Sequence, residues 1–226
     1  MKTTLPSQFD ADPLVGDDAD RQVAGLNIAV AWPLPESVRA AYLDLAARVT
    51  AFDPGLYVYA YETTHVTLVT AINFKQYPDP SPDTVHLVES AAATLADFVV
   101  DAASDLAPFD LEISSPALAR TVAFFSMLNP SGEIARLRER ALDFCRRHGG
   151  ILSNAAAPRT IHATFVRFRR PPRDALAFAA QFEAAARTSR VDRIHVDEIL
   201  VTLETKPYMR AGHRAHRISL RRRPCP

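Results

Sequence analysis

Apolar residues follow alternating strand-like and helix-like patterns from about residue 25 onward. Residues 26–32 form an apolar run short enough for a buried strand. Pro33 and Pro35 end this run, and proline is tolerated in the first turn of a helix. Beyond Pro35, apolar side chains recur at helical spacing, which predicts a helix with one stripe facing a core. The stripe consists of Val38, Ala41, Tyr42, Leu45 and Val49.

The remainder of the chain continues the same alternation. Further strand-like runs cover residues 56–61, 65–72, 109–114, 122–128, 160–168, 196–203 and 213–220. Further helical patterns cover residues 84–102, a segment that begins near Ser131, and a segment that begins at Pro171-Pro172. The order of elements indicates α+β or mixed α/β architecture, with two similarly built halves at about 25–128 and 129–220.

The two ends of the chain differ from this pattern. Residues 1–23 contain five aspartates among prolines and a glycine and show no apolar period, which predicts a mobile acidic tail. Residues 24–226 are then expected to form one domain. The basic end Arg221-Arg222-Arg223 could contact RNA, but a solvated terminus is the commoner situation.

Composition narrows the class of protein. The 226 residues carry a formal net charge of zero, so no global field draws the chain to DNA or an anionic membrane. No run approaches the roughly 18 apolar residues of a membrane span. The two cysteines and the lack of an N-terminal apolar segment indicate a reducing cytosol. We therefore expect a cytoplasmic protein, a monomer, without a membrane partner.

Each half carries one histidine in the same local setting. The sequences are His65-Val66-Thr67-Leu68 and His162-Ala163-Thr164-Phe165. In a strand, residues two apart point to the same face, roughly 6.5–7 Å from each other. Each imidazole is therefore expected to share a face with a threonine hydroxyl, while the intervening residue faces the core.

This combination fits the chemistry of a phosphate ester. One neutral imidazole can take a proton from an attacking water, and one protonated imidazole can give a proton to the departing oxygen. Threonine hydroxyls can donate to the non-bridging oxygens as charge builds. The reaction then needs neither a metal ion nor an organic cofactor.

A structural role is the main alternative for either motif taken alone. A single His-x-Thr in a strand is usually structural, with a half-buried histidine. Two chance matches to the full pattern are expected in roughly 2% of chains of this composition. The matching strand context in each half favours a joint functional role for the two motifs.

With these residues in view, the chain resembles the 2H phosphoesterase superfamily, which includes RNA 2′,3′-cyclic phosphodiesterases and 2′-5′ RNA ligase-like proteins. The surroundings are similar over most of residues 25–220. They comprise Trp32-Pro33-Leu34-Pro35, the strand residues 109–113, the strand residues 196–201, and Arg167 three residues beyond Thr164.

The resemblance implies an α+β fold of two antiparallel-sheet lobes with pseudo-twofold symmetry, helices outside, and one His-x-Thr motif per lobe facing a central cleft. It also implies catalytic roles for His65, Thr67, His162 and Thr164. The chain departs from the family where Val69-Thr70-Ala71 and Ser114-Ser115-Pro116 replace glycine-containing segments. These departures weaken assignment to the RNA-processing members in particular.

Arg167 and Tyr61 are candidate substrate-binding residues. Arg167 could stabilise phosphate charge, although a regular strand places it on the face opposite His162, and a strand-ending arginine is more often solvated. Tyr57, Tyr59 and Tyr61 would share a strand face beside the first motif and could stack a nucleobase. Aromatic residues at this spacing more often serve packing.

Three other groups of residues carry weaker signals. Arg169, Arg170 and Arg173 could follow an RNA backbone, but a solvated loop is commoner. Histidines 195, 213 and 216 have poor spacing for zinc, so no metal site is predicted. Cys145 lies on the apolar stripe of a helix and is expected in the core.

The sequence therefore predicts a metal-independent phosphodiesterase acting on a 2′,3′-cyclic or 2′-5′ phosphodiester of a nucleotide or RNA end. Because the halves are equivalent, either histidine can be the base, and the ligase direction would exchange their roles. Two alternatives stay open. One is an RNA- or nucleotide-binding module of the same fold with little catalysis, and the other is a phosphoesterase for another nucleotide-derived ester.

Overall fold

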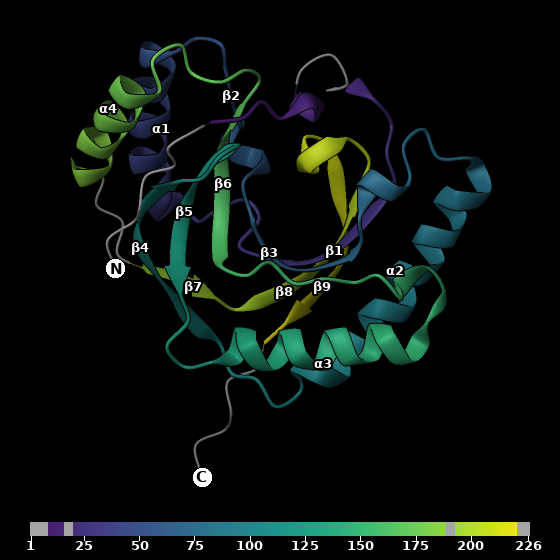
Figure 1. The fold of residues 1–226 in the computed structure, drawn as a ribbon. Coiled ribbons are helices and arrows are strands. Elements are labelled where there is room, and N and C mark those ends of the chain that lie inside the picture. The colour runs from purple at the N-terminus through teal and green to yellow at the C-terminus, as the bar shows by residue number, and fades with distance from the viewer. Residues whose placement is uncertain (1–8, 16–19, 189–192, 221–226) are drawn as a thin grey trace.

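The computed structural model of the chain describes residues 9–15, 20–188 and 193–220, which form two antiparallel sheets with helices outside them (Figure 1). The four-stranded sheet has the order β3 (Val66–Ile72), β1 (Gly25–Val30), β8 (Glu198–Glu204) and β9 (Gly212–Ser219). The five-stranded sheet has the order β2 (Leu56–Val58), β6 (Ile161–Phe168), β5 (Val122–Leu128), β4 (Phe109–Leu118) and β7 (Arg193–Val196).

Each sheet is covered by one helix from each half of the sequence. α2 (Pro82–Ala103) and α3 (Glu133–His148) pack together on the side of the four-stranded sheet. α1 (Glu36–Phe52) and α4 (Ala175–Thr188) pack together beside the five-stranded sheet. Each lobe thus takes elements from both halves, and the predicted α+β fold of two antiparallel-sheet lobes is confirmed.

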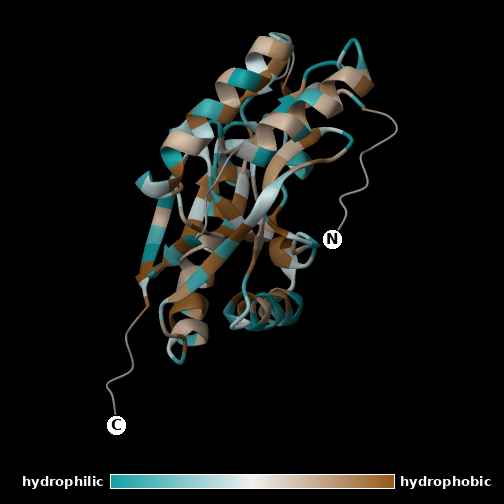
Figure 2. Cartoon of the chain, turned by 90° about the vertical axis from the view of Figure 1, so that its left-hand side faces the viewer, coloured by the Kyte–Doolittle hydropathy of each residue, from teal (hydrophilic) through white to brown (hydrophobic). Residues whose placement is uncertain are grey.

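One hydrophobic cluster extends through both lobes. Brown, hydrophobic segments dominate the central strands, whereas the outer helices show both hydrophilic and hydrophobic turns (Figure 2). The predicted stripe of α1 is buried at Val38, Tyr42, Leu45 and Val49. Cys145 is fully buried in the core, as predicted. Among the described residues, no helix is long and apolar enough to cross a membrane.

Two predicted strands are divided or shortened in the structure, and a third, predicted over 109–114, continues to Leu118 as β4. The run over 56–61 is a strand only to Val58, and Tyr61 begins a 3₁₀ turn, Tyr61–Thr63. The run over 196–203 is divided at Asp197, where the chain leaves β7 in one sheet and enters β8 in the other. Hydrophobic patterning shows that both pieces are extended and buried, but not which sheet each one joins.

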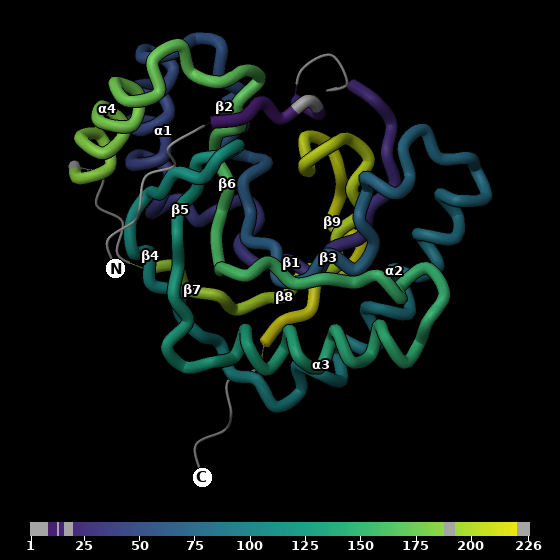
Figure 3. Tube along the Cα trace, in the orientation of Figure 1, coloured from purple at the N-terminus to yellow at the C-terminus, as the bar shows by residue number. Residues whose placement is uncertain are grey.

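Residues 9–15 differ from the expected mobile tail, because they pack on the end of β6. Phe9 is 4% exposed and lies edge-on to the rings of Phe168 and Phe178. The amide of Asp12 donates to the Phe168 carbonyl oxygen at 2.7 Å. Figure 3 shows this purple segment crossing toward the yellow turn before β9. The rest of the predicted tail before residue 20, and the Arg221-Arg222-Arg223 end, lie outside the described residues.

Candidate active site

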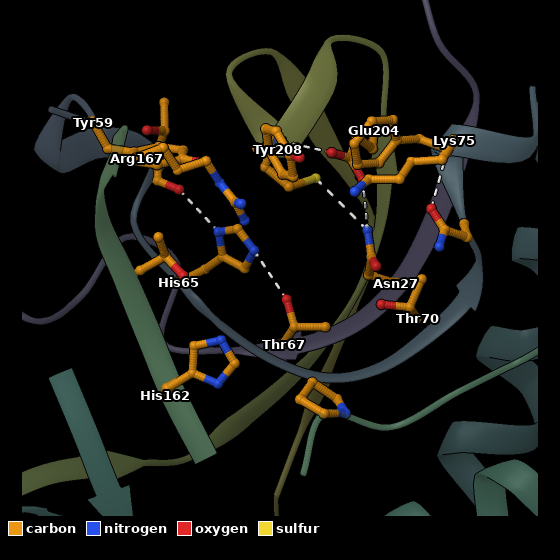
Figure 4. Close-up of a pocket in the computed structure, with 16 residues that line it drawn as sticks. Asn27, Tyr59, His65, Thr67, Thr70, Lys75, His162, Arg167, Glu204 and Tyr208 are labelled. Atoms are coloured by element: carbon orange, nitrogen blue, oxygen red, sulfur yellow. Dashed lines mark hydrogen bonds between the residues drawn. The ribbon is translucent and has the colours of Figure 1, made fainter. Parts of the chain in front are cut away.

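A cavity of about 240 Å³ lies between the two sheets, with β3 and β6 as facing walls. Its lining includes all four residues of the two His-x-Thr motifs, of which His65, Thr67 and His162 are labelled in Figure 4. His65 lies immediately before β3 and Thr67 lies in it, whereas His162 and Thr164 lie in β6. Two motifs almost a hundred residues apart in the sequence therefore face one space.

His65 is held in a defined orientation by two hydrogen bonds. Its Nδ1 lies 2.9 Å from the carbonyl oxygen of Thr63, and its Nε2 lies 3.1 Å from the Thr67 hydroxyl. A carbonyl oxygen can only accept, so Nδ1 carries the proton in the neutral ring. The Thr67 hydroxyl then donates to Nε2, which is the nitrogen left for chemistry.

His162 repeats this arrangement in the other lobe. Its Nδ1 lies 3.2 Å from the carbonyl oxygen of Thr160, again two residues before the histidine. The same tautomer follows, with the proton on Nδ1 and an unprotonated Nε2. Both imidazoles are thus fixed by the backbone through Nδ1, and Nε2 of His65 is hydrogen-bonded to the Thr67 hydroxyl until a ligand replaces that contact.

A β-bulge turns Arg167 into the cavity. The pairing of β6 with β5 shifts register so that Ala123 pairs with Val166 and Phe124 with Thr164. Phe165 is the extra residue, and both it and Val166 are buried. An extra residue reverses the alternation of side chains beyond it. Arg167 therefore lines the cavity, and the opposite-face geometry expected for a regular strand is wrong.

The first motif has the same irregularity. β3 shifts register against β1, and Leu68 and Val69 are both buried. Thr70, five residues after His65 as Arg167 is after His162, consequently also lines the cavity. The two lobes therefore share the bulge as well as the motif, and present threonine in one lobe where the other has arginine.

Arg167 is enclosed by three groups. Its Nε donates to the Tyr59 hydroxyl at 2.8 Å, and its Nη1 donates to Asp12 Oδ2 at 2.7 Å. Its guanidinium carbon lies 3.4 Å from the centre of the Tyr208 ring, a close cation–π contact. Among the described residues, Nη2 has no hydrogen-bond partner, so it is the nitrogen left for an anion in the cavity.

Both catalytic candidates have a lowered pKa. Burial is the main cause of the lowered pKa of His65, and the His162 and Arg167 side chains add to it. Burial also lowers the pKa of His162, with contributions from Arg167 and Arg138. Both rings are therefore neutral near pH 7 on their own, and a bound anion is needed to favour the protonated form of either one.

Glu204 is a buried carboxyl group on the far wall of the cavity. It is 4% exposed, and it accepts hydrogen bonds from the Met209 amide at 2.8 Å and from Asn27 Nδ2 at 3.3 Å. Among the described residues it forms no ion pair, and burial raises its pKa to about 7. These bonds anchor the turn in which Tyr208 and Met209 adopt φ values of 59°.

The raised pKa of Glu204 predicts that the free energy of unfolding depends on pH. Its pKa is about 7 in the folded chain against 4.5 as the ordinary value, so the folded state holds a proton that the unfolded state releases between these values. Stability should fall by about 3 kcal/mol as pH rises through this window. Glu204→Gln should remove that component. Urea unfolding of both proteins at about pH 5 and pH 8 measures it, and an equal pH effect in both would contradict the assignment.

Comparisons with known proteins address the fold. No protein-family model matches the sequence, and no curated protein sequence matches it significantly. Among solved structures, TT0787 of Thermus thermophilus matches with a TM-score of 0.57 and 19% identity, covering 87% of this chain and 97% of that one. Apo LigT of E. coli matches with a TM-score of 0.52 and 16% identity, covering 90% and 100%. A structure described as a phosphoesterase also matches, with a TM-score of 0.52, 16% identity and coverage of 88% and 99%.

This chain has the LigT fold. At such low identities the similarity concerns the fold alone, and it spans nearly the whole of each matched chain. The fold that was expected from the resemblance to the 2H phosphoesterase superfamily is therefore confirmed. The roles of the individual residues rest on the geometry of the cavity.

Tyr61 is misplaced by the sequence prediction. Its ring is in the core, and its hydroxyl donates to the carbonyl oxygens of Leu34 and Pro35. The 3₁₀ turn at Tyr61–Thr63 breaks the strand alternation on which the prediction depended. Tyr59 lines the cavity instead and contacts Arg167. Tyr61 therefore belongs to the core and does not face a substrate in the cavity.

Several residues in and around the cavity escaped the sequence analysis. Asp12, Tyr208, Glu204 and Lys75 belong to segments without a recognisable motif, and only folding brings them near the histidines. A buried glutamate at the end of an apolar strand was the one available signal.

The weaker candidates have contacts elsewhere. His195 contacts Asp110 in the five-stranded sheet, whereas His213 and His216 lie on β9 of the four-stranded sheet. Among the described residues, no group of three or more His, Cys, Asp or Glu side chains is arranged to hold a metal. Arg169 donates to the Val15 carbonyl oxygen and Arg170 pairs with Asp53, so both tie chain segments together.

Proposed function

We propose that this chain is a 2H phosphoesterase that hydrolyses a 2′,3′-cyclic or 2′-5′ phosphodiester of a nucleotide or RNA end by general acid–base catalysis. One observation carries the proposal. Two imidazoles from different lobes line one cavity, and each has Nδ1 bound to the carbonyl oxygen two residues before it. This arrangement supports one Nε2 as proton acceptor and the other as proton donor on a single phosphoryl group.

The proposed reaction has one in-line displacement. A water oxygen forms a bond to phosphorus while the bond from phosphorus to one ribose oxygen breaks. One histidine takes the proton of the water at Nε2, and the other, protonated, gives its Nε2 proton to the departing ribose oxygen. The product is a phosphomonoester, and the pair returns to its starting protonation by exchange with solvent.

The remaining groups would stabilise the charge that develops on phosphorus. Thr67, Thr164 and Arg167 line the same cavity from β3 and β6. The Thr164 hydroxyl and the guanidinium Nη2 would donate to the phosphoryl oxygens, and the Thr67 hydroxyl would join them once His65 Nε2 holds a proton and no longer accepts from it. Donors fixed in place before the reaction stabilise a transition state without reorganising. The set supplies the charge stabilisation from side chains alone, so the proposed reaction proceeds without a metal ion.

An activity panel tests this function. The full chain, with chelator present, is expected to hydrolyse 2′,3′-cyclic nucleotides or short 2′-5′ oligoadenylates, with products separated by chromatography. The 3′-5′ oligoadenylates of equal length and charge serve as the matched comparison. Turnover that appears only after metal addition, or no turnover of any phosphodiester, would refute the proposal.

The lowered histidine pKa values predict an acidic optimum. The competent enzyme has one neutral and one protonated histidine, a form that is most abundant between the two apparent pKa values of the pair. Burial lowers both histidine pKa values below the ordinary 6.5. The value of kcat/KM should therefore peak below pH 6.5 and fall in proportion to proton concentration above its maximum. A 2′,3′-cyclic nucleotide is a suitable probe because its phosphate stays singly charged. A maximum on the alkaline side of neutrality would contradict the assignment.

A further inference from the structure

Asp12 places a negative charge directly behind the cationic side chain of the cavity. Its Oδ2 lies 2.7 Å from Arg167 Nη1, and the two side chains are only 8% and 17% exposed. Asp12 does not line the cavity itself, so Arg167 separates it from any bound phosphate. The ion pair is shielded from solvent, and salt and water screen its charges less than they would at the surface.

The Asp12 carboxylate is fixed by its own segment and by a distant turn. The Asp12 amide donates to Phe168 in β6, and Asp12 Oδ1 accepts the Leu14 amide at 3.1 Å. The Tyr208 hydroxyl donates to both carboxylate oxygens, at 2.9 and 2.7 Å. Tyr208 also stacks its ring on Arg167, so the carboxylate, the phenol and the guanidinium form one closed unit.

The net charge of the side chains that line the cavity is therefore small at about pH 8, where the assay below is made. Asp12 reduces the charge that Arg167 presents, and the other charged lining residues are Lys75 and Glu204, which offset each other once the pH exceeds the Glu204 pKa of about 7. Protonation of one histidine then adds about one positive charge, which matches the single charge of a phosphodiester. A phosphomonoester carries about −1.5 to −2 at neutral pH.

We propose that Asp12 is a specificity-determining residue, which limits the positive charge of the site so that it binds a singly charged phosphodiester in preference to a doubly charged phosphomonoester. This inference rests on the proposed function and extends it to the charge class of the substrate. It also gives the site a means of releasing product, because hydrolysis of the diester creates the second charge.

Asp12→Asn tests the inference, since it removes the charge and keeps an oxygen for Tyr208 and Leu14. The probes are 2′-deoxyadenosine 3′-monophosphate and its methyl ester, which lack the 2′-hydroxyl and differ by one charge. Calorimetry at about pH 8, where the monophosphate is doubly charged, gives both dissociation constants. The variant should favour the monophosphate over the ester by on the order of tenfold more than the unchanged protein does.

A matched control is available in the same segment. Asp10 pairs with the exposed Arg120, outside the cavity, so Asp10→Asn removes an equal charge and should leave the ratio of the two affinities unchanged. A purely structural role of Asp12 would weaken both ligands together and leave the ratio constant. Should Asp12→Asn not fold, Asp12→Ser removes the same charge with a shorter side chain and takes its place.

The outcomes separate this inference from the proposed function. An unchanged ratio in Asp12→Asn, or an equal change in Asp10→Asn, overturns the role of Asp12. Turnover of adenosine 2′,3′-cyclic phosphate by the unchanged protein is measured in parallel. A shifted ratio of the two affinities without turnover supports the role of Asp12 and refutes the esterase function. Turnover with an unchanged ratio refutes only the role of Asp12. Failure of the unchanged protein to bind either probe refutes the role proposed for Asp12, and the turnover assay alone then decides the esterase function.

Discussion

Replacing His65 or His162 by alanine is expected to lower kcat on a 2′,3′-cyclic nucleotide by about 10³-fold, the middle of the range for a lost general acid or base. Each variant removes the Nε2 that its motif presents to the cavity. The double variant should be little worse than either single one, because the two histidines act in one step. Steady-state rates measure the effect, with His86→Ala, an exposed histidine of α2, as the matched control.

The same variants can assign the two roles. A diester with a nitrophenolate leaving group needs no proton on departure, so it should recover most activity in the variant that lacks the acid. The variant that lacks the base should stay impaired on that substrate. Unchanged turnover of the cyclic nucleotide in either alanine variant would contradict the two-histidine mechanism. Recovery of activity on the nitrophenyl diester in both variants would show that neither histidine acts as the base.

Arg167→Met is expected to lower kcat/KM by about 10²–10³-fold, as found when one preorganised donor to a developing oxyanion is lost. The Arg167 guanidinium has Nη2 left for the phosphoryl group, and methionine fills similar space without a donor. The change should also destabilise the fold by about 3 kcal/mol, because the Asp12 carboxylate would remain buried without its cation. Kinetics and urea unfolding measure the two effects separately.

A double variant distinguishes catalysis from folding. Asp12→Asn combined with Arg167→Met removes the unpaired charge, so it should recover most of the lost stability while activity stays low. Arg147→Met, at an exposed arginine of α3, is the matched control for loss of one cation. Recovery of activity together with stability would show that Arg167 serves the fold alone.

Several features of this molecule follow from local sequence patterns. The α1 stripe and the buried Cys145 follow from residue spacing, which acts within one or two turns. The His-x-Thr motifs are also local, because the two-residue period of a strand puts imidazole and hydroxyl on one face wherever the strand lies. For these features the sequence was sufficient.

The direction of Arg167 and the position of Tyr61 could not be predicted in this way. A single extra residue at Phe165 reverses the face of every later side chain in β6, and its cause is the register against β5. The 3₁₀ turn at Tyr61 similarly removes a strand alternation that its residues alone suggested. Register is a property of the pairing between strands, so one strand's residues do not reveal it.

The sequence by itself determined which side chains carry the candidate chemistry and which faces of the elements are buried. Tertiary structure alone decided that Asp12, Tyr59 and Tyr208 surround Arg167, and that the chain changes sheets at Asp197. The physical reason is the range of the interactions. Periodicity and capping act between near neighbours in the chain, whereas a buried ion pair joins residues 155 positions apart only after the core has formed around both.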